Sequence, residues 1–489
     1  MKSFIQFQKN SSGTFNFIFS VSIVGFIFLG LWPYLHIPLT DNEGVFAYIG
    51  QELSSGAKLY QDVWDHKPPL LFIHFLLLKK IGGDEEAFLH IYAALIHCVN
   101  ALLLFWLGKR WLGDRSWWCA ITYVVLILPP FFQCWTPQAE FLMEPFLLGG
   151  LLAVNGKKPW RWLLGGCLFA CGFFTKQSFI FYLPLFFLGN AFAGPLEALY
   201  FFAGMDLMAL LTVLPFMLDG RLNELWYAIW GFNRFYVENG WTWFSYHPEF
   251  RNGLVLWLIK VAEVYGLFFL AAFYFIVNRV VKNVNKKESK ESPFLICWLI
   301  SSLTMVVTSG YFFPYYSVVL ILPLSVLTPI VFVELQKKHS LPVLLLIVFL
   351  VTGPLVSWLT VCHSGTDALE WSGYLKVHNV AAREMGEYLK SIAKPGDQLL
   401  AWSMEPQIYV YSSLSASNYI KTPLVNHLRI MPNVELKAKE AFLKSPPRFV
   451  VISHYDQVNS PPSWLMEDVA RNRKLFYSIG KLELFTFRK

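Results

Sequence analysis

Long apolar runs follow one another through the first three quarters of the chain. A helix needs about 20 mostly apolar residues to span a bilayer, and about eleven stretches approach that length. They lie at Phe15–Pro33, Ala87–Leu107, Trp117–Cys134, Phe141–Val154, Trp160–Phe174, Phe179–Phe192, Leu196–Leu218, Leu254–Val277, Phe294–Ser309, Tyr316–Val333 and Leu341–Val361. The pattern therefore predicts an α-helical polytopic membrane protein.

A different pattern begins after Val361, where short helical and strand-like runs alternate. A helix is expected at Val380–Ala393, and strands at Gln398–Trp402, Arg448–Ser453 and Lys481–Phe487. We therefore expect a membrane domain over 1–362 and a small soluble α/β domain over 363–489. The second domain contains no Gly-rich phosphate loop and no nucleophile motif, so its sequence assigns it no chemistry.

Composition and charge narrow the class of protein. The chain is 55% hydrophobic and 15% charged, whereas soluble domains carry about 25% charged residues. Seven cysteines in 489 residues exclude a small disulfide scaffold. The net charge of +7 comes with basic clusters between alternate spans, which is typical of cytoplasmic loops and does not indicate nucleic-acid binding. We expect a cytoplasmic N-terminus and an extracytoplasmic C-terminal domain.

The first outside loop, 34–86, is the richest in polar groups. Asp41 and Glu43 follow the first span closely enough to meet one substrate. Two carboxylates there can accept a proton from a hydroxyl or hold a cation. They can equally cap a helix that starts near Gly44. Metal dependence stays open, because two carboxylates alone do not define a cation site.

The same loop ends in His66-Lys67-Pro68-Pro69. Proline is well tolerated in a first helical turn, so a helix is expected to start near Pro68. Lys67 then lies at the positive end of a helix dipole, where an anion such as phosphate would stabilise it. The alternative is a lysine that extends to lipid headgroups. The apolar run Leu70–Leu78 is too short to span and is expected to be interfacial.

Further charges stand beside later spans. Glu140 and Glu144 are spaced i, i+4 and can share one helix face, or they simply begin an interfacial helix. Lys176 can meet an anionic lipid or anchor a helix end. Tyr315 lies in an aromatic outside turn, 311–316, of a kind that also occurs in ordinary interfacial belts.

The first loop resembles a known family. Over residues 38–80, the motif Asp41-Asn42-Glu43, then Tyr60, Asp62 and Asp65-His66-Lys67-Pro68-Pro69, is similar to the signature of the dolichyl-phosphate-mannose–protein mannosyltransferase-like family. The nearer likeness is to its bacterial branch, which includes the lipid A aminoarabinose transferases. Weaker similarity continues at Thr175-Lys176-Gln177 and Tyr311–Leu324. Relatives often carry a histidine where Tyr315 stands, and Asn42 separates the two acids that are often adjacent.

The resemblance implies a C-type glycosyltransferase fold, a bacterial inner-membrane location and a polyprenyl-phosphate sugar as donor. It implies that Asp41 is the catalytic carboxylate, with Glu43 its acidic neighbour, and that Lys67 binds the donor phosphate. We expect the following further roles: His66 and Lys176 at the phosphate, Glu140 and Glu144 as acceptor or metal contacts, and Tyr60, Trp64 and Tyr315 as substrate-lining residues. The acceptor stays open among protein, lipid A, glycolipid and polymer.

Under this hypothesis an acceptor hydroxyl attacks the anomeric carbon with inversion, while polyprenyl monophosphate leaves. The main alternative is a transporter or flippase of lipid-linked sugars or other anions. The sequence shows no internal repeat, and its densest polar cluster lies in one outside loop, which favours the enzyme. A scaffold protein would leave the acid and lysine pattern of that loop unexplained.

Overall fold

The computed structural model describes residues 2–83, 85–188, 193–246, 248–283, 292–336, 351–363, 377–417, 422, 434–455 and 460–488. Packing divides the chain into two units that alternate along the sequence. The first comprises Met1–Leu35, His90–Leu210 and Gly240–Gly365, and the second comprises His36–Leu89, Leu211–Asn239 and Thr366–Lys489. The second unit thus combines the first predicted outside loop with the C-terminal region. The predicted domain boundary after residue 362 stays a prediction.

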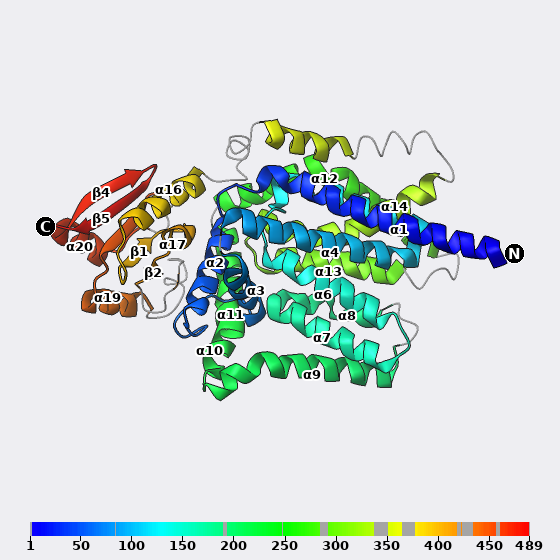
Figure 1. Ribbon diagram of the computed structural model, residues 1–489, viewed down its shortest axis with the longest axis horizontal. Coiled ribbons are helices and arrows are strands. Elements are labelled where there is room, and N and C mark those ends of the chain that lie inside the picture. The colour runs from blue at the N-terminus through cyan, green and yellow to red at the C-terminus, as the bar shows by residue number, and fades with distance from the viewer. Residues whose placement is uncertain are drawn as a thin grey trace. The chain divides into compact units, whose positions relative to one another are not determined.

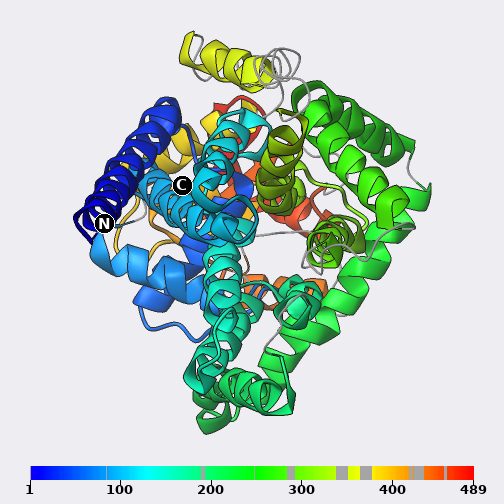
Figure 2. The same ribbon diagram turned by 90° about the vertical axis from the view of Figure 1, so that its right-hand side faces the viewer.

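The first unit is helical. Its helices are α1 (Lys2–Leu31), α5 (Trp117–Ile127), α6 (Ala139–Val154), α7 (Pro159–Thr175), α8 (Leu183–Phe187), α12 (Pro248–Asn283), α13 (Ser292–Thr308) and α14 (Ile321–Gln336), with most of α4 (Glu86–Leu112) and α9 (Pro195–Leu218). Helices α1 and α4 run side by side (Figure 1), and the rings of Phe19 and Phe105 are 5.2 Å apart between them. Figure 2 views this unit from the end at which α1 begins.

Four helical segments in the described residues are long and apolar enough to cross a membrane. They are Asn16–Tyr34, Glu86–Arg115, Pro195–Leu218 and Tyr315–Gln336, and shorter apolar helices accompany them. A polytopic, mostly helical protein is therefore confirmed, whereas the predicted number of spans stays a prediction. Residues 341–350 of the last predicted span and 189–192 of the sixth lie outside the described residues.

Two of the predicted spans contain shorter helices than expected. The span predicted at Trp117–Cys134 is wrong in its second half, because α5 ends at Ile127 and a 3₁₀ turn over Pro130–Phe132 follows. The span predicted at Phe179–Phe192 consists instead of a 3₁₀ helix, Gln177–Tyr182, and the short α8. Proline cannot donate a backbone hydrogen bond, and Pro129 and Pro130 follow the end of α5, so apolar composition alone overstates the length of that helix.

In the second unit, the first loop folds into two helices, α2 (Asp41–Ser54) and α3 (Pro69–Ile81). The predicted helix start beside Pro68 and the short apolar helix are confirmed. The two helices approach closely, since a Cβ on Gly50 would lie 2.8 Å from the carbonyl carbon of Phe75. Only glycine permits that contact without a shift of the backbone.

The C-terminal region forms a five-stranded sheet in the order β2-β1-β3-β5-β4. The strands are β1 (Gln398–Trp402), β2 (Ser415–Ala416), β3 (Phe449–Ser453), β4 (Arg473–Ile479) and β5 (Leu482–Phe487). Strand β1 pairs in parallel with β2 and β3, and β5 pairs antiparallel with β3 and β4. The helix and three strands predicted here are confirmed, as α16 (Val377–Ile392), β1, β3 and β5.

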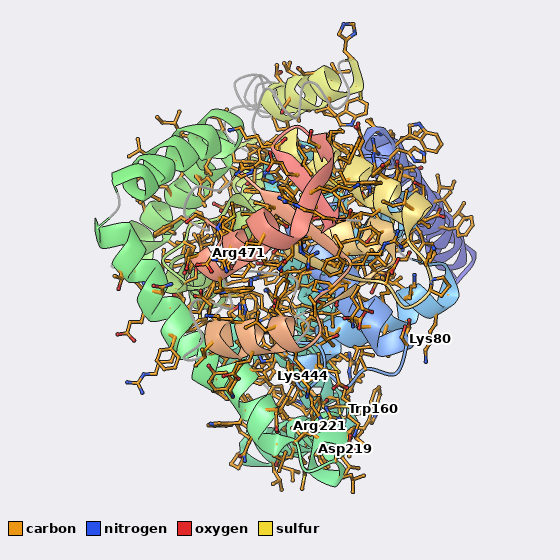
Figure 3. The ribbon with its side chains drawn as sticks, turned by 90° about the vertical axis from the view of Figure 1, so that its left-hand side faces the viewer. Lys80, Trp160, Asp219, Arg221, Lys444 and Arg471 are labelled. Atoms are coloured by element: carbon orange, nitrogen blue, oxygen red, sulfur yellow. The ribbon has the colours of Figure 1, made fainter. Side chains whose placement is uncertain are left out.

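Among the described residues of this region, three helices were not predicted: α17 (Gln407–Ser412), α19 (Val434–Lys444) and α20 (Ser463–Asn472). Helices α19 and α20 contribute Phe442 and Leu465 to a core that includes Trp402 and Ile452 of the sheet. Figure 3 views this region from the opposite side to Figure 2 and labels Lys444 and Arg471 near the ends of these two helices. The charged side chains stay at the surface, and the apolar ones cover the sheet.

Helix α17 packs against α2. The rings of Tyr48 and Tyr409 are 5.1 Å apart, and the Ala416 backbone N–H donates to the Tyr48 hydroxyl at 2.9 Å. A Cβ on Gly44 would lie 2.5 Å from the backbone nitrogen of Gln407. Glycine at position 44 therefore lets the C-terminal region lie directly on the first loop.

We predict that Gly44→Ala destabilises the protein by about 1–3 kcal/mol, because overpacking forces the backbone of α17 away from α2. The measurement is thermal unfolding in detergent, together with the rate of proteolysis of the C-terminal region. Gly25→Ala in α1 is the matched control, since a Cβ there meets nothing within 4 Å. Equal melting temperatures for the two variants would contradict the close packing of α2 and α17.

Candidate active site

Helix α2 begins at Asp41, and Glu43 closes its first turn. The Thr40 backbone N–H donates to Glu43 Oε2 at 2.9 Å, and the Thr40 hydroxyl donates to the same oxygen at 3.0 Å. Glu43 is fully buried. This is a capping box, in which an acid at the third helical position satisfies backbone donors at the helix start. Glu43 thus makes the helix-capping contacts that the sequence offered as an alternative. Its role as the acidic neighbour in catalysis stays a prediction.

Asp41, two residues earlier, faces the C-terminal region. Its Oδ1 lies 3.5 Å from Nε2 of His378 in the first turn of α16. The other ring nitrogen, Nδ1, lies 3.5 Å from Oε1 of Glu405, which is fully buried between β1 and α17. The imidazole of His378 therefore lies between two carboxylates. One belongs to the first loop (Asp41) and the other to the C-terminal region (Glu405).

His378 and Glu405 were not predicted as site residues. No local motif surrounds either of them, and the sequence assigned the C-terminal domain no chemistry. The available signal was weak: a histidine at the start of an amphipathic helix, and an acid three positions after a buried strand. The structure places both side chains near Asp41, and the sequence-based view that this domain carries no chemistry stays a prediction.

Hydrogen bonds from the C-terminal region hold the chain just before Asp41. The Leu39 N–H donates to the Tyr411 hydroxyl at 2.8 Å, and Asn379 Nδ2 donates to the Leu39 carbonyl at 3.1 Å. The Tyr411 hydroxyl in turn donates to Glu86 Oε1 at 2.7 Å. Burial and the nearby Glu86 carboxylate raise the pKa of Tyr411 well above its usual value, so the hydroxyl keeps its proton and donates.

Lys67 lies directly before α3, as predicted. Its Nζ is 3.6 Å from Asp65 Oδ1 and 5.3 Å from the centre of the Phe46 ring on α2. The Lys67 backbone N–H also donates to Asp65 Oδ1 at 3.0 Å. The ammonium thus lies beside α2, in the same unit as Asp41, with a buried carboxylate and an aromatic face to fix its position.

The backbone at Tyr60 is held in a left-handed conformation, with φ of +67°. A bulky residue adopts it rarely and at a cost of about 1–3 kcal/mol. The Tyr60 hydroxyl donates to the Lys67 carbonyl at 2.6 Å. Burial, and then the charge of Asp65, raise the pKa of Tyr60 well above its usual value, so this donor keeps its proton. Tyr60 therefore holds the backbone of Lys67.

Aromatic packing holds the remaining residues of this segment. The His66 ring stacks on Tyr236 at 4.7 Å, and Trp64 meets Phe232 edge-on at 4.8 Å. Both partners belong to α11 (Phe232–Tyr246). In addition, Asn233 Nδ2 donates to the His66 carbonyl at 2.9 Å. Helix α11 therefore fixes His66 and Trp64 from one side.

A charged cluster anchors the loop ahead of Tyr60. Arg221 Nη1 donates to the Leu59 carbonyl at 2.7 Å, and Arg221 Nη2 donates to Asp219 Oδ2 at 2.7 Å. Figure 3 labels these two side chains close together. The hydrogen bond from Arg221, and then the charge of Lys58, lower the pKa of Asp219. The carboxylate thus stays charged and holds the guanidinium in place.

The other predicted site residues belong to the first unit. Glu140 on α6 forms an ion pair with Lys176, which follows α7. Lys176 Nζ also lies 4.6 Å from the centre of the Tyr316 ring, and the Tyr315 and Tyr316 rings are 4.8 Å apart. The structure thus brings together Glu140, Lys176 and this aromatic turn. Lys176 contacts a carboxylate, and its part in phosphate binding stays a prediction.

Glu144, one turn along α6 from Glu140, enters a separate buried network. Asn100 Nδ2 donates to Glu144 Oε2 at 2.7 Å, and the Tyr123 hydroxyl donates to the same oxygen at 3.3 Å. His97 Nδ1 lies 2.7 Å from that hydroxyl. The network ties α4, α5 and α6 together. Glu140 and Glu144 therefore have different observed partners, although they share one helix.

The described residues contain no group of three or more histidine, cysteine or acidic side chains arranged to hold a metal ion. The question of a divalent cation, which the sequence left open, stays open.

Known proteins resemble this chain in sequence and fold. A dolichol phosphate-mannose mannosyltransferase from Haloferax volcanii is 25% identical over 217 residues, which are 42% of this chain and 45% of that protein. The similarity thus covers less than half the length of this curated relative. No protein-family model matches the chain. The resemblance to mannosyltransferases that the first loop predicted is confirmed by this match.

Two solved structures share the fold. One is the oligosaccharyltransferase AglB of Archaeoglobus fulgidus in complex with an inhibitory peptide and a dolichol-phosphate, with a TM-score of 0.56, 12% identity, and coverage of 98% of this chain and 75% of that one. The other is an Archaeoglobus fulgidus oligosaccharyltransferase tethered with an acceptor peptide, with a TM-score of 0.53, 13% identity, and coverage of 89% and 69%. The chain thus has the fold of these two structures, and the predicted mostly helical fold with a small C-terminal sheet is confirmed.

We predict that Glu43→Ala lowers the free energy of unfolding by about 0.5–2 kcal/mol, as the loss of a helix cap does. Glu43→Gln keeps an acceptor oxygen for Thr40 and is expected to unfold at a temperature close to that of the wild type. Thermal unfolding of both purified variants in detergent provides the measurement. If Glu43→Gln were as unstable as Glu43→Ala, the capping role would be insufficient to explain the burial of this carboxylate.

Proposed function

We propose that this protein is a membrane glycosyltransferase that moves a sugar from a polyprenyl-phosphate donor to an acceptor hydroxyl on the extracytoplasmic side. The observation that carries the proposal is that Asp41 and Lys67 are both fixed around α2 within one unit. The similarity to a dolichol phosphate-mannose mannosyltransferase and the shared fold support it.

Lys67 is proposed to bind the donor phosphate. A lysine at a helix N-terminus is stabilised by an anion, and the developing charge on the leaving phosphate is such an anion. Asp65, Phe46 and the Tyr60 hydroxyl fix the position of Lys67. Phe46 lies five positions after Asp41, an offset of about 7.5 Å along the helix axis. Asp41 and Phe46 also differ by about 140° around the helix, so the approach of the Lys67 ammonium and the Asp41 carboxylate to one donor is part of this proposal.

Asp41 is proposed to accept the proton of the acceptor hydroxyl while that oxygen attacks the anomeric carbon. Attack from the face opposite the phosphate gives inversion. Glu43 is proposed to support this step by fixing the first turn of α2 through its bonds to Thr40. His66, Tyr60 and Trp64 are proposed to line the donor side of the site in the same unit.

Several finer features belong to the same proposal. They are a bacterial inner-membrane location, about eleven spans, a cytoplasmic N-terminus, and an extracytoplasmic soluble domain over 363–489. Lys176, Glu140, Glu144 and Tyr315 are retained as candidate donor, acceptor or metal contacts of the first unit. The acceptor class is left open among protein, lipid A, glycolipid and polymer.

We predict that Asp41→Asn lowers sugar transfer by about 10²–10⁴, as the loss of a positioned base does. Lys67→Ala is expected to lower transfer by about 10²–10³, because the leaving phosphate loses its charge partner. The assay uses membranes supplied with tritium-labelled mannosyl phosphoundecaprenol. It measures both the release of undecaprenyl phosphate and label in a glycosidic product.

Asp114→Asn and Lys80→Ala are the matched controls, since both side chains are exposed. Figure 3 labels Lys80 on the face that it views. Near-normal transfer by both site variants at wild-type expression would refute the assignment of Asp41 and Lys67. A wild-type protein that changes only the sidedness of the labelled lipid, without forming a glycosidic bond, would identify a transporter instead.

A further inference from the structure

Two side chains of the C-terminal region form a row with Asp41: His378 lies beside the Asp41 carboxylate, and Glu405 lies on the other side of the imidazole. We propose that His378 and Glu405 are positioning residues for Asp41, so that the C-terminal region completes the site of the first loop. The inference rests on the proposed function, because it assigns these residues to the same transfer reaction.

The geometry is that of an imidazole with one carboxylate at each nitrogen. Nε2 of His378 is 3.5 Å from Asp41 Oδ1, and Nδ1 is 3.5 Å from Glu405 Oε1. The exposed fraction of the side chain falls along this row, from 26% for Asp41 to 12% for His378 and 0% for Glu405. A carboxylate behind a histidine selects which ring nitrogen carries a proton and fixes the plane of the ring. Here Nε2 must present its N–H to Oδ1 of Asp41, and Glu405 on the Nδ1 side fixes the plane of the ring.

Two neighbouring contacts fix the position of the His378 ring. Asn379, the residue after His378, donates to the carbonyl of Leu39, two residues before Asp41. The ring of Tyr455 meets the His378 ring at a steep angle, with the ring centres 5.4 Å apart. Since Asn379 follows His378 and Leu39 lies two residues before Asp41, the hydrogen bond between Asn379 and Leu39 keeps His378 and Asp41 near each other.

This arrangement gives His378 a specific task. It orients Oδ1 of Asp41, and Oδ2 is assigned to the acceptor hydroxyl. During transfer, the acceptor oxygen bonds to the anomeric carbon and its proton passes to Asp41. The bond from that carbon to the phosphate oxygen breaks, and its electron pair leaves with polyprenyl phosphate. His378 and Glu405 do not touch the sugar, and they act through the orientation of Asp41.

A purely structural role is the competing explanation, because His378 also lies where the C-terminal region packs on α2. A matched structural contact exists at the other end of α2, where the Ser415 hydroxyl donates to Glu52 Oε1 at 2.7 Å. Ser415→Ala removes a packing hydrogen bond between the same two segments without touching Asp41. Comparison with this variant separates positioning from packing.

The experiment compares full-length His378→Phe, His378→Gln, Glu405→Gln, Ser415→Ala and Asp41→Asn with labelled mannosyl phosphoundecaprenol, and measures kcat, the donor KM and thermal stability. His378→Phe keeps the ring but loses its N–H groups, and we expect kcat to fall about 10- to 100-fold with little change in KM. His378→Gln retains a donor and is expected to recover part of this loss. The double variant of His378→Phe and Glu405→Gln is expected to be no slower than His378→Phe, since Glu405 acts through His378.

Ser415→Ala is expected to keep the wild-type kcat. Two results would overturn the proposal: a wild-type kcat in His378→Phe while Asp41→Asn is inactive, or a fall in kcat for Ser415→Ala as large as that for His378→Phe. Full activity of Asp41→Asn would instead refute the assignment of Asp41, and a wild-type protein that forms no glycosidic bond would refute the proposed function. The failure of one proposal is therefore distinguishable from the failure of the other.

Discussion

The first turn of α2 depends on a small set of hydrogen bonds around residues 39–43. Glu43 satisfies the donors of Thr40 from within the helix, and Tyr411 and Asn379 satisfy both polar groups of the Leu39 backbone from the C-terminal region. Backbone groups buried without partners are costly, so this pairing fixes where the helix begins. The starting point of the helix determines where the Asp41 side chain points, and therefore its position beside His378.

The apolar pattern predicted most of the helices, because lipid-length runs leave the backbone no other way to pair its polar groups. It overstated the lengths of two spans, and for one of them the reason is that hydropathy does not register the interruption of the helix by Pro129 and Pro130. In the C-terminal domain, period-two patterns predicted three strands. They missed β4, which lies at one edge of the sheet and is largely exposed.

The candidate site was predictable only where its signals are local in sequence. The start of α3 at Pro69 and the capping alternative for Glu43 follow from neighbouring residues, and both agree with the structure. His378 and Glu405 reach Asp41 through tertiary packing, and Asn379 and Leu39 are separated by 340 positions. No periodicity or short motif encodes such a pairing. The ion pair of Glu140 with Lys176 was missed for the same reason.

In the second unit, the first loop and the C-terminal region are far apart in the sequence, and this separation has a consequence for biogenesis. The ribosome completes the first loop long before it synthesises Asn379 and Tyr411, whose bonds fix Leu39. During that interval the beginning of α2 has only its own capping box. The nascent loop therefore acquires its final geometry in a late docking event, and chains that terminate early leave that docking surface, including Gly44 and Tyr48, uncovered.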